Sequence, residues 1–221
     1  MRGLFVTGTG TGVGKTAVAA AVCAALRARG EPVAAWKPVV TGTDEPPGDW
    51  PPDHELLAEV AGADPASVAP LTFGPPVSPH LAAELAGTRI EPAELVAAAR
   101  RAADERFLVA EGVGGLLVPL TPGYLVRDLA RDLGLPLLIA ARPGLGTINH
   151  TLLTLEAARA VGLEVAAVVM TPWPGEPSDV ERSNREAIAA IGGVAVAGLA
   201  PTAPEALATA GESLPLDAWL S

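Results

Sequence analysis

A glycine-rich segment that ends in Lys15 and Thr16 has the clearest chemical meaning in this sequence. Residues 8–16 read GTGTGVGKT, and the strict phosphate-loop pattern G-x-x-x-x-G-K-[ST] fails by one position, because its first glycine falls on Thr9. Glycines let successive backbone N–H groups face an anion, Lys15 can reach the β- and γ-phosphates, and the Thr16 hydroxyl can bind Mg²⁺. The segment predicts a nucleoside triphosphate site, and the alternative is a turn that binds nothing.

Acidic side chains are needed to complete a metal site beside such a loop. Glu111 directly follows the apolar run at 107–110 and precedes Gly-Val-Gly-Gly, so we expect it at the carboxyl end of a strand. Carboxylate oxygens suit Mg²⁺. Asp53 is a second candidate, although it could instead be the N-cap of a helix. Three further acids precede it in the chain and compete for this role: Asp44, Glu45 and Asp49.

Lysine is rare in this chain, which makes its two occurrences informative. Of the 15 basic residues only Lys15 and Lys37 are lysines. An ammonium group is a compact charge that a guanidinium cannot always replace. Lys37 follows a second apolar run and begins the segment KPVVTG, so it is expected to be a second cation near the transferred phosphoryl group. The alternative is a surface lysine with its charge in water.

The elements that must position these residues alternate along the chain. Apolar runs predict six strands, at residues 3–6, 32–36, 107–110, 136–141, 165–170 and 194–199. Helical patterns occupy residues 16–29, 53–60, 79–85, 91–104, 124–133, 147–161 and 179–191, and residues 43–52 predict a loop. Continuous apolar strands separated by helices predict an α/β fold with a mostly parallel sheet, helices on both faces and the phosphate-loop NTPase type. We expect a single domain over residues 1–221.

Composition excludes several classes of protein. The chain has 221 residues, 49% of them hydrophobic, and a formal charge of −10, which disfavours broad binding to nucleic acid or to an anionic membrane. Its one cysteine, Cys23, permits no disulfide within the chain and fits a cytoplasmic location. We expect no signal peptide, and no apolar stretch reaches the roughly 20 residues that span a bilayer.

Five segments together resemble the dethiobiotin synthetase family of the biotin pathway. They are VTGTGTGVGKT at 6–16, KPVVTG at 37–42, SPHLAAE at 78–84, EGVGGLLVPL at 111–120 and LGTINHTLLTLE at 145–156. Beyond about residue 161 the resemblance thins to the α/β pattern and LAPTAPE at 199–205. The resemblance implies an ATP- and Mg²⁺-dependent enzyme that joins CO₂ to 7,8-diaminononanoate. Ring closure would proceed through a carbamate and a carbamic–phosphoric anhydride.

The resemblance also implies roles for individual residues. Lys37 and Lys15 would be catalytic, Lys37 and Thr41 would contact the substrate, and Mg²⁺ would be held by Thr16, Asp53 and Glu111. A homodimer is implied, in which the partner subunit offers the helix start formed by Gly146, Thr147, Ile148 and Asn149 to the substrate. The nucleotide contacts implied or expected are Gly12, Val13, Gly14, Lys15, Thr16, Ala17, Asp53, Glu111, Gly112, Val113, Gly114, Thr171, Pro172, Pro201, Thr202 and Ala203.

One departure from the family concerns the nucleobase. Relatives usually carry an asparagine at the end of the fifth strand, where its amide contacts adenine, and this chain has Met170 followed by Thr171. Methionine has no donor and only a weak acceptor. We therefore expect weak discrimination between nucleobases, unless backbone groups near Thr171 and residues 201–203 contact the base.

Two alternative functions remain open at this point. A partitioning-type ATPase switch would share the fold, but such proteins carry a second lysine near the start of the loop, which this chain lacks. A small-metabolite kinase would transfer phosphate and stop there. The roles of His54, His80 and His150 stay open, because no pair of them has zinc-ligand spacing.

Overall fold

The central sheet is parallel throughout and has β1 in its middle. The computed structural model describes residues 1–46 and 48–220. The strands are β1 (Gly3–Gly8), β2 (Val33–Trp36), β5 (Phe107–Glu111), β8 (Leu137–Ala141), β9 (Val165–Met170) and β10 (Val196–Gly198). Their order is β10-β9-β8-β1-β5-β2, and every neighbouring pair is parallel. The predicted sheet is confirmed, with strand ends that differ by one or two residues.

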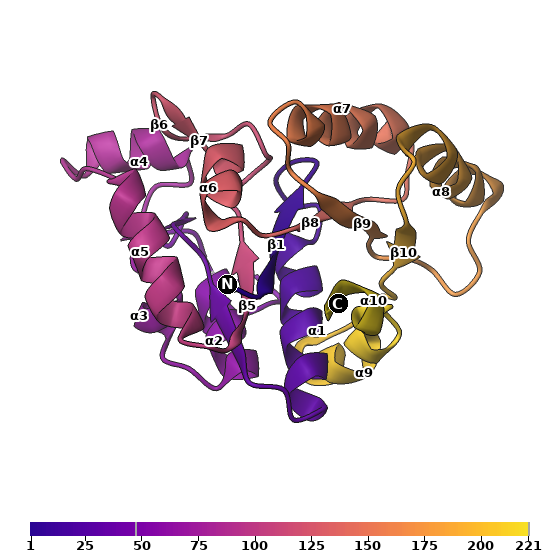
Figure 1. The fold of residues 1–221 in the computed structure, drawn as a ribbon, viewed down its shortest axis with the longest axis horizontal. Coiled ribbons are helices and arrows are strands. Elements are labelled where there is room, and N and C mark those ends of the chain that lie inside the picture. The colour runs from indigo at the N-terminus through magenta and orange to yellow at the C-terminus, as the bar shows by residue number, and fades with distance from the viewer. Residues whose placement is uncertain (47, 221) are drawn as a thin grey trace.

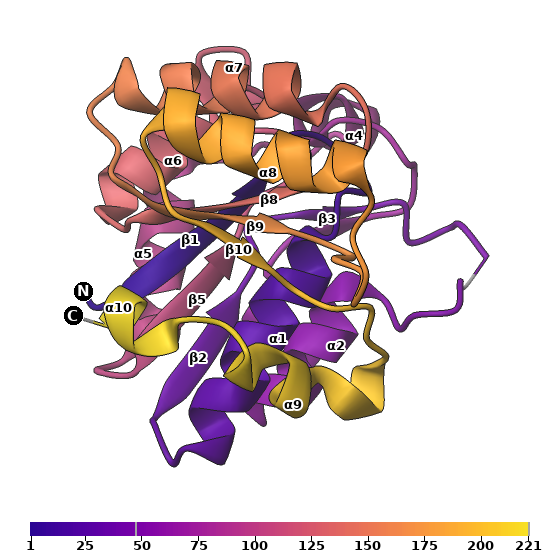
Figure 2. The same cartoon turned by 90° about the vertical axis from the view of Figure 1, so that its right-hand side faces the viewer.

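Helices cover both faces of this sheet, as predicted (Figures 1 and 2). One face carries α1 (Lys15–Ala28), α2 (Asp53–Ala61), α3 (Pro65–Val68), α9 (Leu207–Glu212) and α10 (Leu216–Leu220). The other carries α4 (Pro79–Leu85), α5 (Pro92–Ala103), α6 (Val126–Leu133), α7 (Thr147–Arg159) and α8 (Asp179–Gly192). Each layer therefore encloses its own apolar cluster against the sheet.

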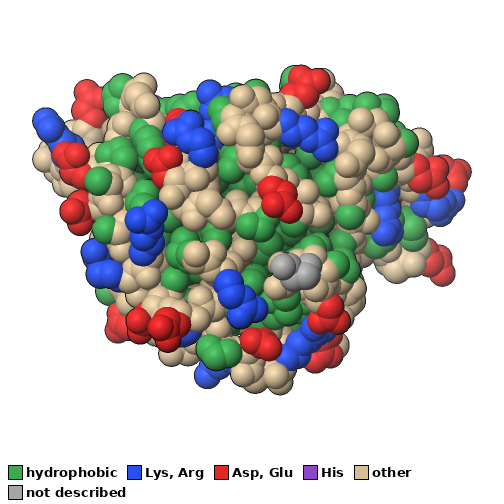
Figure 3. Space-filling view, viewed as in Figure 1, with side chains coloured by type: hydrophobic (Ala, Val, Ile, Leu, Met, Phe, Trp, Pro, Cys, Tyr) green, Lys and Arg blue, Asp and Glu red, His purple; other side chains and the backbone are tan. Residues whose placement is uncertain are grey.

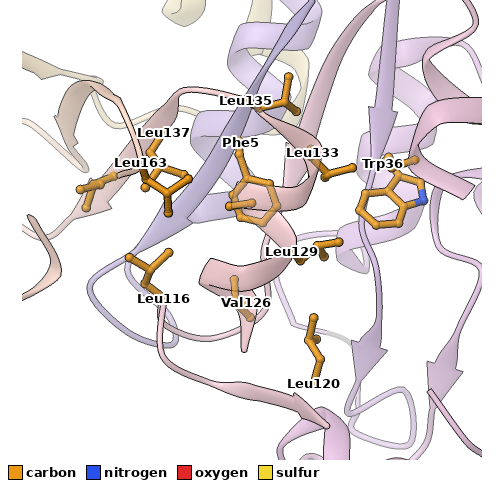
Figure 4. Close-up of a cluster of buried hydrophobic side chains, with 14 of the residues drawn as sticks. Phe5, Trp36, Leu116, Leu120, Val126, Leu129, Leu133, Leu135, Leu137 and Leu163 are labelled. Atoms are coloured by element: carbon orange, nitrogen blue, oxygen red, sulfur yellow. The ribbon is translucent and has the colours of Figure 1, made fainter. Parts of the chain in front are cut away.

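The alternation of side chains along β1 supplies both clusters. Leu4 and Val6 belong to the cluster around α1, and Phe5 points to the opposite side. Figure 4 shows Phe5 among side chains of α6, with Trp36 of β2 at one end of the same cluster. Neighbouring residues of a strand point to opposite faces, so one apolar run can serve two layers.

Helix α1 is buried on nearly all sides, as its apolar sequence predicts. Cys23 has no exposed surface. Helix α9 packs against α1, and Gly211 lies so close that a Cβ there would fall 2.1 Å from the carbonyl oxygen of Ala21. Only glycine permits this approach of the two backbones.

Short elements depart from the sequence prediction. The pair β3 (Val40–Thr41) and β4 (Thr72–Phe73), the pair β6 (Pro119–Thr121) and β7 (Tyr124–Leu125), the 3₁₀ helix η1 (Pro204–Ala206), α3, α9 and α10 were not predicted. The helix predicted at 124–133 begins at Val126, because Tyr124 pairs with Thr121 across an antiparallel ladder. The backbone N–H of Leu125 then donates to Asp128 at 2.9 Å and caps the helix.

The surface carries charges of both signs. On the face seen in Figure 3, Lys and Arg side chains are interspersed with Asp and Glu. Among the described residues, no helix combines the length and the apolar character required to cross a bilayer. The absence of a nucleic-acid partner stays a prediction.

Candidate active site

The carboxyl ends of the parallel strands meet at one edge of the sheet, and the predicted residues gather there. Strand β1 leads into the phosphate loop, β2 leads to Lys37, and β5 ends on Glu111. Gly12 and Gly14 have φ angles of +70° and +93°, which favour glycine, and Gly14 precedes the first turn of α1. The loop thus presents backbone N–H groups and a helix N-terminus to this edge, as an anion site requires.

Four side chains from distant parts of the sequence form one hydrogen-bonded cluster. The Thr16 hydroxyl lies 2.8 Å from Asp53 Oδ1 and 3.0 Å from Glu111 Oε1. Lys37 Nζ donates to Asp53 Oδ2 at 2.7 Å and to Glu111 Oε1 at 2.5 Å. Pro52, not Asp53, is the N-cap of α2, and no side chain caps that helix. The Asp53 carboxylate therefore serves the cluster and not the helix end.

Burial and charge pairing set the electrostatics of this cluster. Burial alone would lower the pKa of Lys37, but the Glu111 and Asp53 carboxylates outweigh it and raise that pKa. Burial raises the pKa of Glu111, and the Lys37 ammonium opposes this effect. At Asp53 burial is outweighed by Lys37 and Thr16, and the pKa falls. Lys37 therefore stays charged at neutral pH.

Lys15 lies beside the cluster but bonds within its own loop. Its ammonium donates to the carbonyl oxygen of Gly10 at 2.9 Å. Burial lowers the pKa of Lys15, and the neighbouring Lys37 charge acts in the same direction, against the pull of Glu111. Two ammonium groups thus lie near two carboxylates at the base of the phosphate loop.

The oxygen atoms of the cluster are suitable ligands for a magnesium ion. Thr16, Asp53 and Glu111 converge, and Glu111 Oε2 is a buried oxygen without a hydrogen-bond partner. Mg²⁺ prefers hard oxygen ligands and completes its shell with phosphate oxygens and water. Within the described part of the chain, no group of three or more His, Cys, Asp and Glu residues could hold a metal ion. A magnesium ion at this place would be held by the two carboxylates, the Thr16 hydroxyl and oxygens of a bound ligand or water.

Two cavities adjoin the loop. The large cavity has a volume of about 900 Å³, and the predicted residues on its wall are Gly12, Gly14, Lys15, Thr16, Ala17, Lys37, Thr41, Asp53, Glu111, Val113 and Gly114, together with the competing acid Glu45. The side cavity has about 460 Å³, and the predicted residues on its wall are Gly12, Val13, Gly14, Ala17, Thr171, Pro172, Pro201 and Thr202. Gly112 and Ala203 are not among the described residues of either wall.

The start of α7 lies apart from the large cavity of its own chain. Thr147 is buried and lines a third cavity of about 450 Å³ together with His150. Gly146, Ile148 and Asn149 are absent from the described walls of the large and side cavities. Leu145, immediately before, is 98% exposed. This helix start therefore presents its surface outward.

Arg142 and Trp50 are among the wall residues that sequence reasoning missed. Arg142 donates from Nε at 3.1 Å and from Nη2 at 2.7 Å to the carbonyl oxygen of Gly12, and it lines all three cavities. It directly follows an apolar run, as Lys37 does, and this signal could have revealed it. Trp50 lines the large and side cavities, and nothing in the irregular sequence around it indicates such a place.

Met170 and the three histidines lie outside the described wall of the large cavity. Met170 has no exposed surface and belongs to the core. His80 Nδ1 lies 3.0 Å from the Ser78 hydroxyl, and His54 Nδ1 is buried without a hydrogen-bond partner. None of the three histidines is on the described wall of the large cavity.

Comparison with known proteins connects this geometry to a family. A family model described as an AAA domain matches residues 2–208. A protein of Anaeromyxobacter dehalogenans named ATP-dependent dethiobiotin synthetase BioD is 50% identical over 173 residues, which cover 77% of this chain and 76% of that protein. A protein of the same name from Mycobacterium sp. is 40% identical over 200 residues, covering 89% and 87%. A ParA family ATPase from Chlorobium tepidum shares the fold alone, with a TM-score of 0.56, 14% identity, and coverage of 96% and 90%.

Proposed function

The chain belongs to the ATP-dependent dethiobiotin synthetase family, and we propose that it joins CO₂ to 7,8-diaminononanoate and closes the ureido ring of dethiobiotin. It is an ATP-dependent ligase of biotin synthesis. The cluster of Thr16, Lys37, Asp53 and Glu111 beside the phosphate loop supports the proposal most directly. This cluster combines a phosphate site, oxygen donors for a metal ion and a charged lysine.

The proposed reaction needs activation of a poor electrophile. One amine adds to CO₂ and loses a proton, which gives a carbamate. A carbamate oxygen then attacks the γ-phosphorus of ATP, ADP leaves, and a carbamic–phosphoric anhydride remains. The second amine attacks the carbonyl carbon, phosphate leaves with the bonding electron pair, and a proton is lost. Because both amines are on adjacent carbons, ring closure is intramolecular and gains several powers of ten in effective concentration.

The residues of the chain divide this work. The backbone N–H groups of residues 12–17 would hold the triphosphate, and Lys15 would exchange its bond to Gly10 for a phosphate oxygen. Lys37 is kept charged by its two carboxylate partners and would stabilise the charge on the transferred phosphoryl group. Thr41 on the large cavity would contact the substrate.

Thr16, Asp53 and Glu111 would hold Mg²⁺ together with oxygens of the nucleotide. The bound ion would neutralise charge on the phosphate oxygens. Lys37 bonds the same two carboxylates. Asp53 and Glu111 would therefore hold both the lysine ammonium and the metal ion close to the transferred phosphoryl group.

We also propose a homodimer, because the outward start of α7 does not line the large cavity of its own chain. Gly146, Thr147, Ile148 and Asn149 of each protomer would then receive the substrate carboxylate in the other protomer. Each protomer would be one domain over residues 1–221. The need for ATP and the single buried cysteine support a cytoplasmic location.

The test is a product assay with purified protein, ATP, Mg²⁺, 7,8-diaminononanoate and bicarbonate. Phosphate release that requires both the diamine and bicarbonate, together with dethiobiotin in the mass spectrum, is the expected result. A stable phosphorylated product would instead indicate a kinase. Hydrolysis of ATP at the same rate without diamine and bicarbonate would indicate a switch, and either result would overturn the proposal.

A further inference from the structure

Trp50 is the aromatic side chain on the described wall of the side cavity. The other residues of that wall are Gly12, Val13, Gly14, Ala17, Arg142, Thr171, Pro172, Ala200, Pro201 and Thr202. Trp50 also lines the large cavity and is only half-buried, although it packs against the apolar cluster around α1. It therefore stands where the two cavities adjoin.

The side cavity continues directly from the phosphate loop. Gly12, Gly14 and Ala17 belong to the walls of both cavities. A nucleotide whose phosphates lie on the loop can thus place its base in the side cavity. Its volume of about 460 Å³ lies within the range of ordinary small-ligand sites.

Several groups that could contact the edge of a base are already engaged within the protein. The backbone N–H of Thr171 donates to Ala141 at 2.9 Å, and the Thr202 hydroxyl donates to Ala203 at 3.3 Å. The guanidinium of Arg142 is bonded to Gly12, and Met170 has no exposed surface. These particular groups are therefore already engaged, whereas the wall also carries the aromatic side chain of Trp50.

We propose that Trp50 holds the nucleobase of the triphosphate by stacking. Every base has a π-face, so stacking adds affinity with little discrimination among bases. This inference deepens the proposed function, because it assumes that the phosphate loop binds a nucleoside triphosphate. Stacking on Trp50 would add nearly the same affinity for each of the four nucleobases.

Binding measurements on the full chain can distinguish the affinity contributed by the base from the affinity contributed by the phosphates. The affinities of ATP, CTP, GTP, UTP and inorganic tripolyphosphate are compared for the wild type, Trp50→Ala and Trp50→Phe by titration calorimetry. Stacking is worth about fivefold to 150-fold in affinity. We expect Trp50→Ala to weaken all four nucleotides by at least about fivefold and to leave tripolyphosphate unchanged. Trp50→Phe is expected to retain most of the affinity.

Either of two outcomes overturns the proposal. The first is nucleotide affinity that does not change in Trp50→Ala. The second is an equal loss for tripolyphosphate, which means that Trp50 supports only the fold of the loop. Trp173→Phe is the matched control, because Trp173 packs against Gly198 and Arg185 and is outside the described walls of the two cavities.

Fluorescence supplies a readout that does not depend on turnover. Quenching of tryptophan emission by ATP is expected in the wild type and in Trp173→Phe, and is expected to disappear in Trp50→Phe. Quenching that persists in Trp50→Phe contradicts stacking on Trp50. A protein that binds ATP through Trp50 but forms no dethiobiotin would overturn the proposed function and leave this inference intact.

Discussion

Lys37 Nζ lies 2.5 Å from Glu111 Oε1, and the side chains of both residues are buried. Such a pair offsets two desolvation costs, so removal of one partner leaves an uncompensated charge in the interior. Loss of Lys37 is therefore expected to destabilise the fold, in addition to its proposed effect on the charge of the phosphoryl group. Experiments on Lys37 must measure both effects.

Substitution of Lys37 is expected to reduce turnover strongly. Lys37→Ala removes an electrostatic stabiliser and should lower kcat about 10²-fold or more. Lys37→Arg should also fail substantially, because the wider guanidinium must fit where the lysine is 3% exposed. Steady-state kinetics of dethiobiotin formation measure this. Near-normal turnover of Lys37→Arg would contradict the need for a compact cation.

A double variant separates folding from catalysis. Lys37→Met leaves Glu111 without its partner and should lower the free energy of unfolding by about 3 kcal/mol. Lys37→Met combined with Glu111→Gln should recover part of that stability and none of the activity. Urea unfolding measures the free energy of unfolding of each variant. Glu111→Gln alone completes the cycle, and a double-variant loss equal to the sum of the two single losses would mean that the two side chains are not coupled.

The metal prediction concerns Asp53 and Glu111. Asp53→Asn and Glu111→Gln preserve shape and remove charge, so each should raise the Mg²⁺ concentration needed for half-maximal activity. Activity is titrated against Mg²⁺ at fixed ATP. Asp49→Asn, at an exposed acid of the preceding loop, is the control for loss of one negative charge. A titration of Asp53→Asn identical to the wild type would exclude Asp53 as a ligand.

Base selectivity should be weak. Met170 has no exposed surface, so it adds no contact to the edge of a base. CTP or GTP should replace ATP with a loss of less than about tenfold, which is roughly 1.4 kcal/mol. The values of kcat/KM for four triphosphates at saturating diamine and bicarbonate decide this. A preference for ATP above about a hundredfold would show that another group contacts the base edge.

Subunit mixing tests the shared site. Lys37→Met damages the phosphate side, and Asn149→Asp places a negative charge at the exposed start of α7. If each site uses α7 of the partner, mixed dimers contain one intact site, and activity should return to roughly a quarter of the wild type. A mixture that stays inactive after proven subunit exchange would place the whole site in one chain.

Cys23 offers a check on the buried helix α1. Burial raises the pKa of its thiol, so little thiolate forms and none of the side chain is exposed. A disulfide reagent should not react with the native protein between pH 7 and about 9.5, and should react stoichiometrically in urea. Rapid reaction of the native protein would mean that α1 opens readily.

The site residues that could be predicted from the sequence are those at the carboxyl ends of strands. Lys37 and Glu111 directly follow or end apolar runs, and a parallel sheet brings such ends together. The contact of Arg142 with Gly12 depends on β8 being the neighbour of β1, and the order of strands is a tertiary property that no local pattern contains. Likewise, α9 and α10 owe their places to packing on distant residues, and β3 and β4 have two residues each.

The close fit of Gly211 against Ala21 has a consequence for how the protein is made. A ribosome releases the chain from its first residue, so α1 emerges long before the helix that covers it. A nascent chain that has completed all six strands of the sheet still carries an alanine-rich helix with one side open. At this stage the uncovered side of α1 is apolar surface of the kind that chaperones shield.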